Sequence, residues 1–153
     1  MSETQEFTIT VEQEQDYVFR IQFDDTAAPD LFSDEPEPLG GGQGPNPSRL
    51  LTAAVANCMS ASLLFALRKF KNQPGKLHTR AKATLGRNEA GRLRVEKIDA
   101  EIRLPESADS YANLDRILAQ FEQFCVVTES VRHGVEVNVS VADADGKLLH
   151  GVT

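Results

Sequence analysis

Hydrophobic and polar residues alternate in two stretches near the amino terminus, with the polar residues 12–16 between them. The apolar residues fall on odd positions, which are Phe7, Ile9 and Val11 in the first stretch and Tyr17, Phe19, Ile21 and Phe23 in the second. A period of two is typical of strands, so we predict a hairpin over residues 7–23 with one buried face. Arg20 belongs to the opposite face of the second strand, which looks into solvent or a cleft.

Residues 24–46 interrupt this alternation with four prolines and four glycines, and no regular element is predicted there. A loop of this length in a compact domain is either functional or a plain crossover connection. The acidic residues Asp34, Glu35 and Glu37, which are followed by glycines at 40–42, favour a shaped surface loop.

The next segment is uncharged for eighteen residues, from Leu50 to Leu67. Asn46 suits a helix cap and Pro47 the first helical turn, and helix-stopping residues follow at 72–75. The run is long enough to span a membrane, but it contains four polar residues, Thr52, Asn57, Ser60 and Ser62. We therefore predict a central helix that is buried nearly all round.

Further along, alternating residues at 77–85 and 92–104 predict a second hairpin, and a change of phase predicts a bulge near Glu96 or Lys97. Residues 108–124 have helical spacing, which places Cys125 at the end of a buried stripe. A short helical turn over 128–132 and a last strand over 135–141 complete the chain. The order ββαββαβ contains no βαβ unit and favours an α+β fold.

Length and charge narrow the range of possible domains, partners and locations. The chain has 153 residues, 41% of them hydrophobic and 25% charged, which predicts one folded domain over residues 1–153. A net charge of -7 opposes binding to phosphate backbones and anionic lipids, so neither nucleic acid nor a membrane is expected as a partner. The amino terminus resembles no secretory leader, and the cytoplasm is the expected location.

Two cysteines, Cys58 and Cys125, carry the candidate chemistry. Neither they nor the three histidines show the paired spacing of a zinc site, so no metal is expected. A lasting disulfide is uncommon in a reducing compartment. Two alternatives remain, namely that both thiols are small buried hydrophobes or that they form a redox pair that cycles.

A redox pair needs a stabilised thiolate, a second thiol within reach and access for an oxidant. The thiolate would attack the O–O bond of a peroxide, release an alcohol and become a sulfenic acid, which the second thiol converts to a disulfide. An external dithiol would then restore both thiols. No cofactor is expected, because the chain has no nucleotide-binding motif and the glycine-rich residues 40–44 do not follow a strand.

Three segments carry a resemblance to a known family. The first runs from Asp34 through the glycines to Asn46-Pro47, the second leads through alanines from Leu50 to Cys58, and the third runs from Phe124 to Val137. Together they resemble the OsmC/Ohr family of bacterial hydroperoxide-reducing proteins, and in particular its broader OsmC-like branch. The resemblance spans most of the chain.

The resemblance implies an OsmC-like α+β fold with two curved antiparallel sheets around central helices, in an intertwined homodimer with its active sites at the dimer interface. It implies that Cys58 is the peroxidatic thiol and Cys125 the resolving thiol. Organic hydroperoxides are the implied substrates, and a dithiol such as a lipoyl group is the implied reductant. The alternative is a non-enzymatic OsmC-like dimer that binds a small apolar or thiol-bearing ligand.

Two features depart from the family's peroxidases, which are the residue after Asn-Pro and the absence of a turn arginine before the glycine-rich loop. Ser48 stands where they have a glutamate after Asn-Pro, and it cannot form the salt bridge that fixes their catalytic arginine. Arg20 is the only arginine before Arg49, so it is the candidate thiolate-stabilising cation, with a solvated surface arginine as the alternative. Glu129 and Arg132 are spaced for a helical ion pair, with tuning of a thiol by Arg132 as the alternative.

Overall fold

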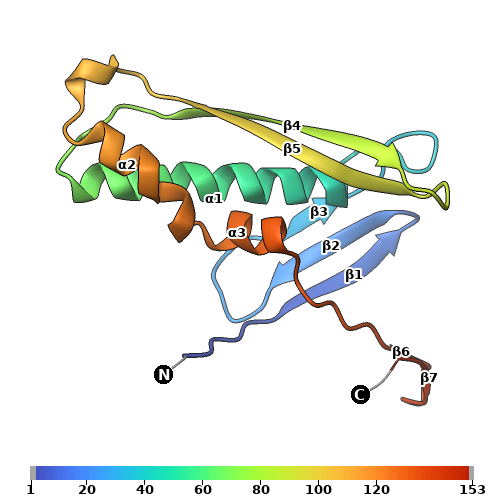
Figure 1. The fold of residues 1–153 in the computed structure, drawn as a ribbon. Helices are drawn as coiled ribbons and strands as arrows, with labels where there is room; N and C mark the ends of the chain where they lie inside the picture. The colour runs from blue at the N-terminus through green and yellow to red at the C-terminus, as the bar shows by residue number, and fades with distance from the viewer. Residues whose placement is uncertain (1–2, 152–153) are drawn as a thin grey trace. The chain divides into compact units, whose positions relative to one another are not determined.

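The protein is described from a computed structural model, which places residues 3–151. Its elements are β1 (Ile9–Gln15), β2 (Val18–Phe23), β3 (Leu31–Ser33), α1 (Pro47–Lys69), β4 (His78–Arg87), β5 (Leu93–Arg103), η1 (Ala108–Ser110), α2 (Leu114–Gln120), η2 (Phe121–Phe124), α3 (Val126–His133), β6 (Val141–Ala142) and β7 (Leu148–His150). Helices and antiparallel strands thus combine as predicted (Figure 1).

Contacts divide the chain into two compact units, Met1–Asn57 with His78–Arg103 and Cys58–Leu77 with Leu104–Thr153. Helix α1 contributes its first turns to one unit and its last turns to the other. A single domain over residues 1–153 stays a prediction.

The first unit begins with an antiparallel sheet in the order β1-β2-β3. The predicted hairpin over residues 7–23 is confirmed, although β1 continues to Gln15 and leaves a tighter turn than expected. The expectation of no regular element in residues 24–46 is wrong, because Leu31–Ser33 form β3, which pairs with residues 19–21 of β2. The predicted buried face is also wrong for the single chain, since Phe7 is 90% exposed and all of β1 is exposed.

The loop after β3 folds around the carboxylate of Asp34, which is 2% exposed. This carboxylate accepts backbone N–H bonds from Glu35 at 2.7 Å, Gly41 at 3.2 Å and Gln43 at 3.1 Å. A side chain at Gly40 would lie 2.3 Å from the Glu35 carbonyl oxygen, so only glycine fits there. The shaped loop predicted from the sequence is confirmed, and its backbone donors are occupied by the protein's own anion.

We expect Asp34→Asn to lower the melting temperature by several degrees at neutral pH. The Gln43 N–H bond, followed by those of Glu35 and Gly41, holds the pKa of Asp34 below its usual value of 3.8. Because the folded pKa is the lower one, the carboxylate stabilises the fold above the unfolded pKa, and this stability is lost as pH falls through the folded pKa. The difference in melting temperature between the two proteins should therefore be present at neutral pH and shrink in acid. Asp145→Asn, in an exposed turn, is the control, and a gap that persists unchanged in acid would contradict the assignment.

Strands β4 and β5 form a long hairpin in the first unit (Figure 1). Their register pairs Thr84 with Lys97 and then Leu85 with Val95, which leaves Glu96 without an opposite residue. The bulge predicted near Glu96 or Lys97 is therefore confirmed. It keeps apolar side chains on one face of the hairpin on both sides of the phase change.

Helix α1 begins as predicted, with the Asn46 side chain accepting the Arg49 N–H at 3.0 Å. It is long and apolar enough to cross a membrane by length and composition alone, but only 17% of its most apolar window is buried. The prediction of a helix buried nearly all round is therefore wrong for the single chain. Val55, Leu63 and Leu67 are its buried hydrophobic residues, and other apolar side chains of the helix face outward.

In the second unit, α2 lies beside the last turns of α1, and the start of α3 lies near Cys58 at the middle of α1 (Figure 1). The helix predicted over 108–124 is divided into η1, α2 and η2, and the break before α2 lies at Asn113, which adopts a left-handed conformation with φ of 59°. The predicted turn over 128–132 is confirmed within α3, which ends at Gly134 with φ of 82°.

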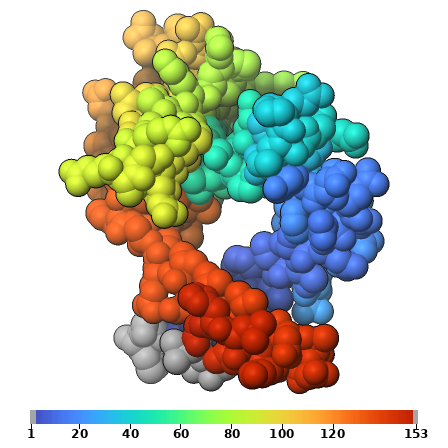
Figure 2. Space-filling view, turned by 90° about the vertical axis from the view of Figure 1, so that its right-hand side faces the viewer, coloured from blue at the N-terminus to red at the C-terminus, as the bar shows by residue number. Residues whose placement is uncertain are grey.

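The predicted strand over residues 135–141 is wrong for the single chain, since only its last residue pairs, in the short hairpin of β6 and β7. Val135 is 65% exposed, Val137 78% and Val139 61%. Figure 2 shows this carboxyl-terminal segment, in orange to red, at the surface. Its alternation remains that of a strand, but no described strand pairs with residues 135–140.

Candidate functional site

The two cysteines meet in the second compact unit. Both are free thiols, and a side-chain hydrogen bond between them raises the pKa of Cys58 and lowers that of Cys125. Cys58 comes from α1 and is partly exposed, while Cys125 comes from the junction of η2 and α3 and is 0% exposed. The structure therefore brings together the two thiols that the sequence selected.

Local packing explains how residues 67 positions apart (125 minus 58) come to face each other. The buried Asn72 side chain, after α1, donates to the Ala112 carbonyl at 3.0 Å and accepts its N–H at 2.8 Å. This two-point contact fixes the start of α2 beside the end of α1. Leu67 on α1 and Ile117 on α2 are 0% and 1% exposed, so they form the apolar core of this unit.

Hydrogen bonds decide which thiol ionises first. Burial raises the pKa of Cys58, and its bond with Cys125 acts in the same direction. Burial also opposes ionisation of Cys125, but bonds with the Cys58 thiol, the Thr128 hydroxyl and backbone, and the Ser62 hydroxyl lower its pKa. The pair loses its first proton at Cys125, because the donors converge there.

Thr128 and Ser62 were not identified from the sequence as part of the site. Cys125 Sγ donates to Thr128 Oγ1 at 2.9 Å, and the hydroxyl can rotate to donate when the sulfur is ionised. The Thr128 N–H also lowers the pKa of Cys125, although the Cys125 side chain forms no capping hydrogen bond with α3. Their spacings were available as a signal, since Ser62 lies one helical turn after Cys58 and Thr128 lies three residues after Cys125.

A charged cluster lies next to the thiols. Arg132 donates to Glu129 and also to Glu122, the latter at 2.9 Å. His133 Nε2 lies 3.3 Å from the second carboxylate oxygen of Glu129. The Glu122 hydrogen bond, followed by the charge of Glu129, raises the pKa of Arg132, and charge at Cys125 acts in the same direction. The helical ion pair predicted for Glu129 and Arg132 is confirmed.

Arg20 lies in the first compact unit, on β2. Its guanidinium forms ion pairs with Glu14 at 3.1 Å, Glu12 at 3.6 Å and Asp30 at 4.0 Å. The contact between Arg20 Nε and Glu14 is an ion pair without the geometry of a hydrogen bond. A role for Arg20 at the thiols stays a prediction.

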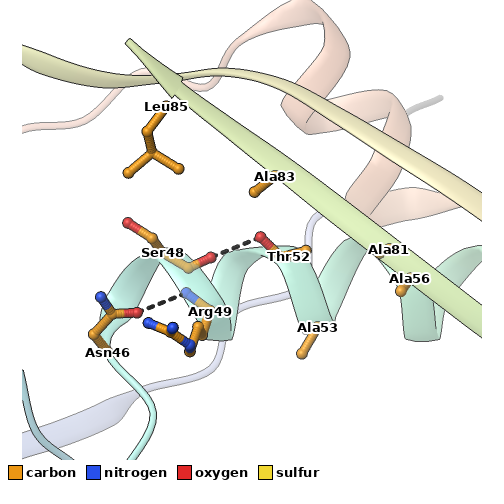
Figure 3. A pocket seen from close by; sticks show the side chains of 9 residues that line it. All are labelled: Asn46, Ser48, Arg49, Thr52, Ala53, Ala56, Ala81, Ala83 and Leu85. Carbon is orange, nitrogen blue, oxygen red and sulfur yellow. Dashed lines mark hydrogen bonds between the residues drawn. The ribbon is translucent and has the colours of Figure 1, made fainter. Parts of the chain in front are cut away.

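The first unit also contains an open pocket of about 590 Å³ between α1 and β4 (Figure 3). Alanines form much of its wall, together with Leu85 of β4. Its polar end holds Asn46, Ser48, Arg49 and Thr52, and the Thr52 hydroxyl donates to the Ser48 carbonyl at 2.8 Å. Among residues 3–151, no carboxylate forms an ion pair with Arg49.

Two other kinds of site find no support. The backbone donors of Gly41 and Gln43 bind Asp34, so the glycine-rich loop is not an open phosphate cradle. Within the part of the chain that the structure describes, no group of three or more His, Cys, Asp or Glu side chains is placed to hold a metal ion.

Solved structures share the fold at low sequence identity. An OsmC-like protein of unknown function from Vibrio cholerae has a TM-score of 0.67 and 16% identity, covering 83% of this chain and 94% of its own. An OsmC-like protein from Mycoplasma pneumoniae gives 0.65 and 17%, covering 84% and 88%. The organic hydroperoxide resistance protein OhrB of Bacillus subtilis gives 0.60 and 20%, covering 86% and 95%.

A comparison with curated proteins found no match. The sequence does match a family model, that of the OsmC-like proteins, over residues 40–140. This range includes both cysteines, the whole of α1 and residues 40–46 of the loop that precedes it. The chain therefore belongs to the OsmC-like protein family.

Proposed function

We propose that the protein reduces organic hydroperoxides, with Cys58 as the attacking thiol and Cys125 as the resolving thiol. The observation that carries this proposal is that two reduced thiols of the same compact unit lie near enough for each to shift the pKa of the other. A hydroperoxide resistance protein among the structural neighbours is consistent with this substrate class.

The proposed reaction balances in two steps. A Cys58 thiolate attacks the terminal oxygen of ROOH, the O–O bond breaks, and the alkoxide takes a proton to leave as ROH. Cys58 becomes a sulfenic acid, and two electrons have passed from sulfur to oxygen. The Cys125 sulfur then attacks the sulfenic sulfur and a disulfide forms, while the hydroxyl group leaves as water with one proton.

Exposure supports this division of roles. A peroxide can approach Cys58, which is partly exposed, whereas Cys125 is 0% exposed. The ionised Cys125 sulfur accepts the Cys58 thiol proton as a general base while the Cys58 sulfur attacks the peroxide. The same contact then leaves Cys125 beside the sulfenic acid that it resolves.

A dithiol, such as a lipoyl group, would regenerate the enzyme by exchange and leave as its own disulfide. The cycle uses sulfur chemistry alone, so it calls for no organic cofactor. It does call for a compartment in which thiols are kept reduced, and we assign the protein to the cytoplasm on this ground.

Titration with cumene hydroperoxide tests the proposed function. One equivalent should consume two thiols per chain and produce one cumyl alcohol, because the disulfide accounts for two electrons. Free-thiol titration and mass spectrometry would measure the products, with addition of a dithiol restoring both thiols. Thiols that stay reduced under excess peroxide would overturn the proposal.

We also propose that the active form is a homodimer. Leu51 and Phe65 on α1 are 37% and 69% exposed, and the valines at 135–139 have a strand pattern without a described partner. Both features place apolar surface in water, and a second copy of the chain would cover it. Intertwining of the two chains, implied by the family resemblance, belongs to this proposal.

The pocket near Ser48 favours a second candidate function, which is binding of a small apolar or thiol-bearing ligand without catalysis. Its alanine wall offers apolar contact, and its polar residues lie at one end (Figure 3). This candidate would be supported by thiols that resist peroxide together with a melting temperature that rises with ligand concentration.

A further inference from the structure

Acidic residues lie close to Cys125 along the chain, and their charge affects how readily its thiol ionises. Glu122 lies on η2 three residues before Cys125, and Glu129 lies on α3 four residues after it. Two acidic residues thus lie within about one helical turn of Cys125, one on either side along the chain. Without a nearby cation, their charges would disfavour ionisation of the Cys125 thiol.

Arg132 is held between these two carboxylates. Its two terminal nitrogens bond to Glu129 and to Glu122, so the guanidinium extends back along α3 from its own position to η2. Helical side chains lean towards the amino terminus, which is the direction of Cys125. The Cys125 N–H donates to the Glu122 carbonyl at 3.1 Å, so the sulfur and the acceptor of Arg132 share one turn.

We propose that Arg132, held in place by Glu122 and Glu129, is the cation that stabilises the thiolate of the Cys58–Cys125 pair. Coupling between two charges is reciprocal, so a thiolate that favours the charged arginine is itself favoured by it. The Glu122 hydrogen bond and the charge of Glu129 are the main causes that raise the pKa of Arg132, and charge at Cys125 adds to them. Arg132 acts on the reaction through the thiols and is therefore a positioning residue.

The remaining groups around the pair define the expected pH behaviour. Cys58 and Ser62 face Cys125 from α1, and neither brings a formal charge while Cys58 is a thiol. On α3, His133 contacts Glu129 and adds a positive charge only when it is protonated. Arg132 is thus the one permanent cation among the described contacts of this cluster.

The inference concerns the thiol pair of the proposed function, but its test needs no peroxide, so the two can fail separately. Cys58→Ser leaves Cys125 as the sole cysteine of the chain, and its ultraviolet thiolate absorbance then reports one ionisation. We expect Arg132→Gln in this background to move the titration midpoint to higher pH. Glu129→Gln should move the midpoint to lower pH. It removes a negative charge, and it frees the positive charge of Arg132 from this ion pair.

Opposite shifts separate an electrostatic role from a structural one, since damage to α3 would not reverse sign between the two variants. Arg116→Gln, which removes an exposed positive charge from α2, is the matched control and should leave the midpoint in place. A midpoint unaffected by Arg132→Gln, or one that moves only with Arg20→Gln, would overturn the assignment.

Discussion

Cys58→Ser abolishes hydroperoxide turnover, which is the largest effect we expect from any single substitution. A serine hydroxyl is not ionised at neutral pH and is a far weaker nucleophile towards an O–O bond than a thiolate, so the rate should fall by about a thousandfold or more, to that of the uncatalysed reaction. Loss of cumene hydroperoxide under excess dithiol measures this rate. A variant that consumes peroxide as fast as the wild type would exclude Cys58 as the attacking group.

Cys125→Ser is the matched substitution at the other thiol and should give a different result. Cys58 can still be oxidised once, but no neighbouring thiol converts its sulfenic acid to a disulfide. We expect a single equivalent of peroxide to be consumed, followed by arrest, with the sulfenic acid captured by dimedone. Sustained turnover by both variants would show that neither thiol is required.

Phe65→Glu should separate the proposed dimer into monomers. Phe65 is 69% exposed on α1, and its burial against a second copy would make it an interface residue of high energetic weight. A buried, unpaired carboxylate in its place should weaken association by about 2–4 kcal/mol. Sedimentation velocity over a range of concentrations measures the change.

Two control variants make this test specific. Phe65→Leu keeps an apolar side chain and should remain dimeric. Arg80→Glu changes the charge of an exposed residue on β4 and should have no effect on assembly. A wild-type chain that is monomeric at all concentrations would contradict the proposed dimer directly.

Periodicity predicted the local elements well because it reports which side of an element is apolar. The hairpins, the bulge at Glu96 and the extent of α1 followed from it. Periodicity does not report what covers an apolar face. The burial expected for α1 and the pairing expected for residues 135–141 therefore failed in the single chain, although the apolar patterns themselves are present.

The site, like the fold, was predictable in its local parts but not in its tertiary contacts. Two thiols on apolar helical positions could be selected from the sequence, and the structure places them in contact. Strand β3 was missed because three paired residues leave almost no periodic signal. The environment of Cys125 depends on which turn of α1 packs against η2 and α3. This is a tertiary contact that the sequence pattern does not report, so Ser62 was not predicted as part of the site.

The contact between Cys58 and Cys125 also links catalysis to conformational entropy. A disulfide between them would close a loop of 67 positions (125 minus 58), which restricts the unfolded chain by about 4 kcal/mol. Each turnover would then alternate the protein between a cross-linked form that resists unfolding and proteolysis and an open form that does not. The dithiol that restores activity would at the same moment return the chain to its ordinary susceptibility to degradation.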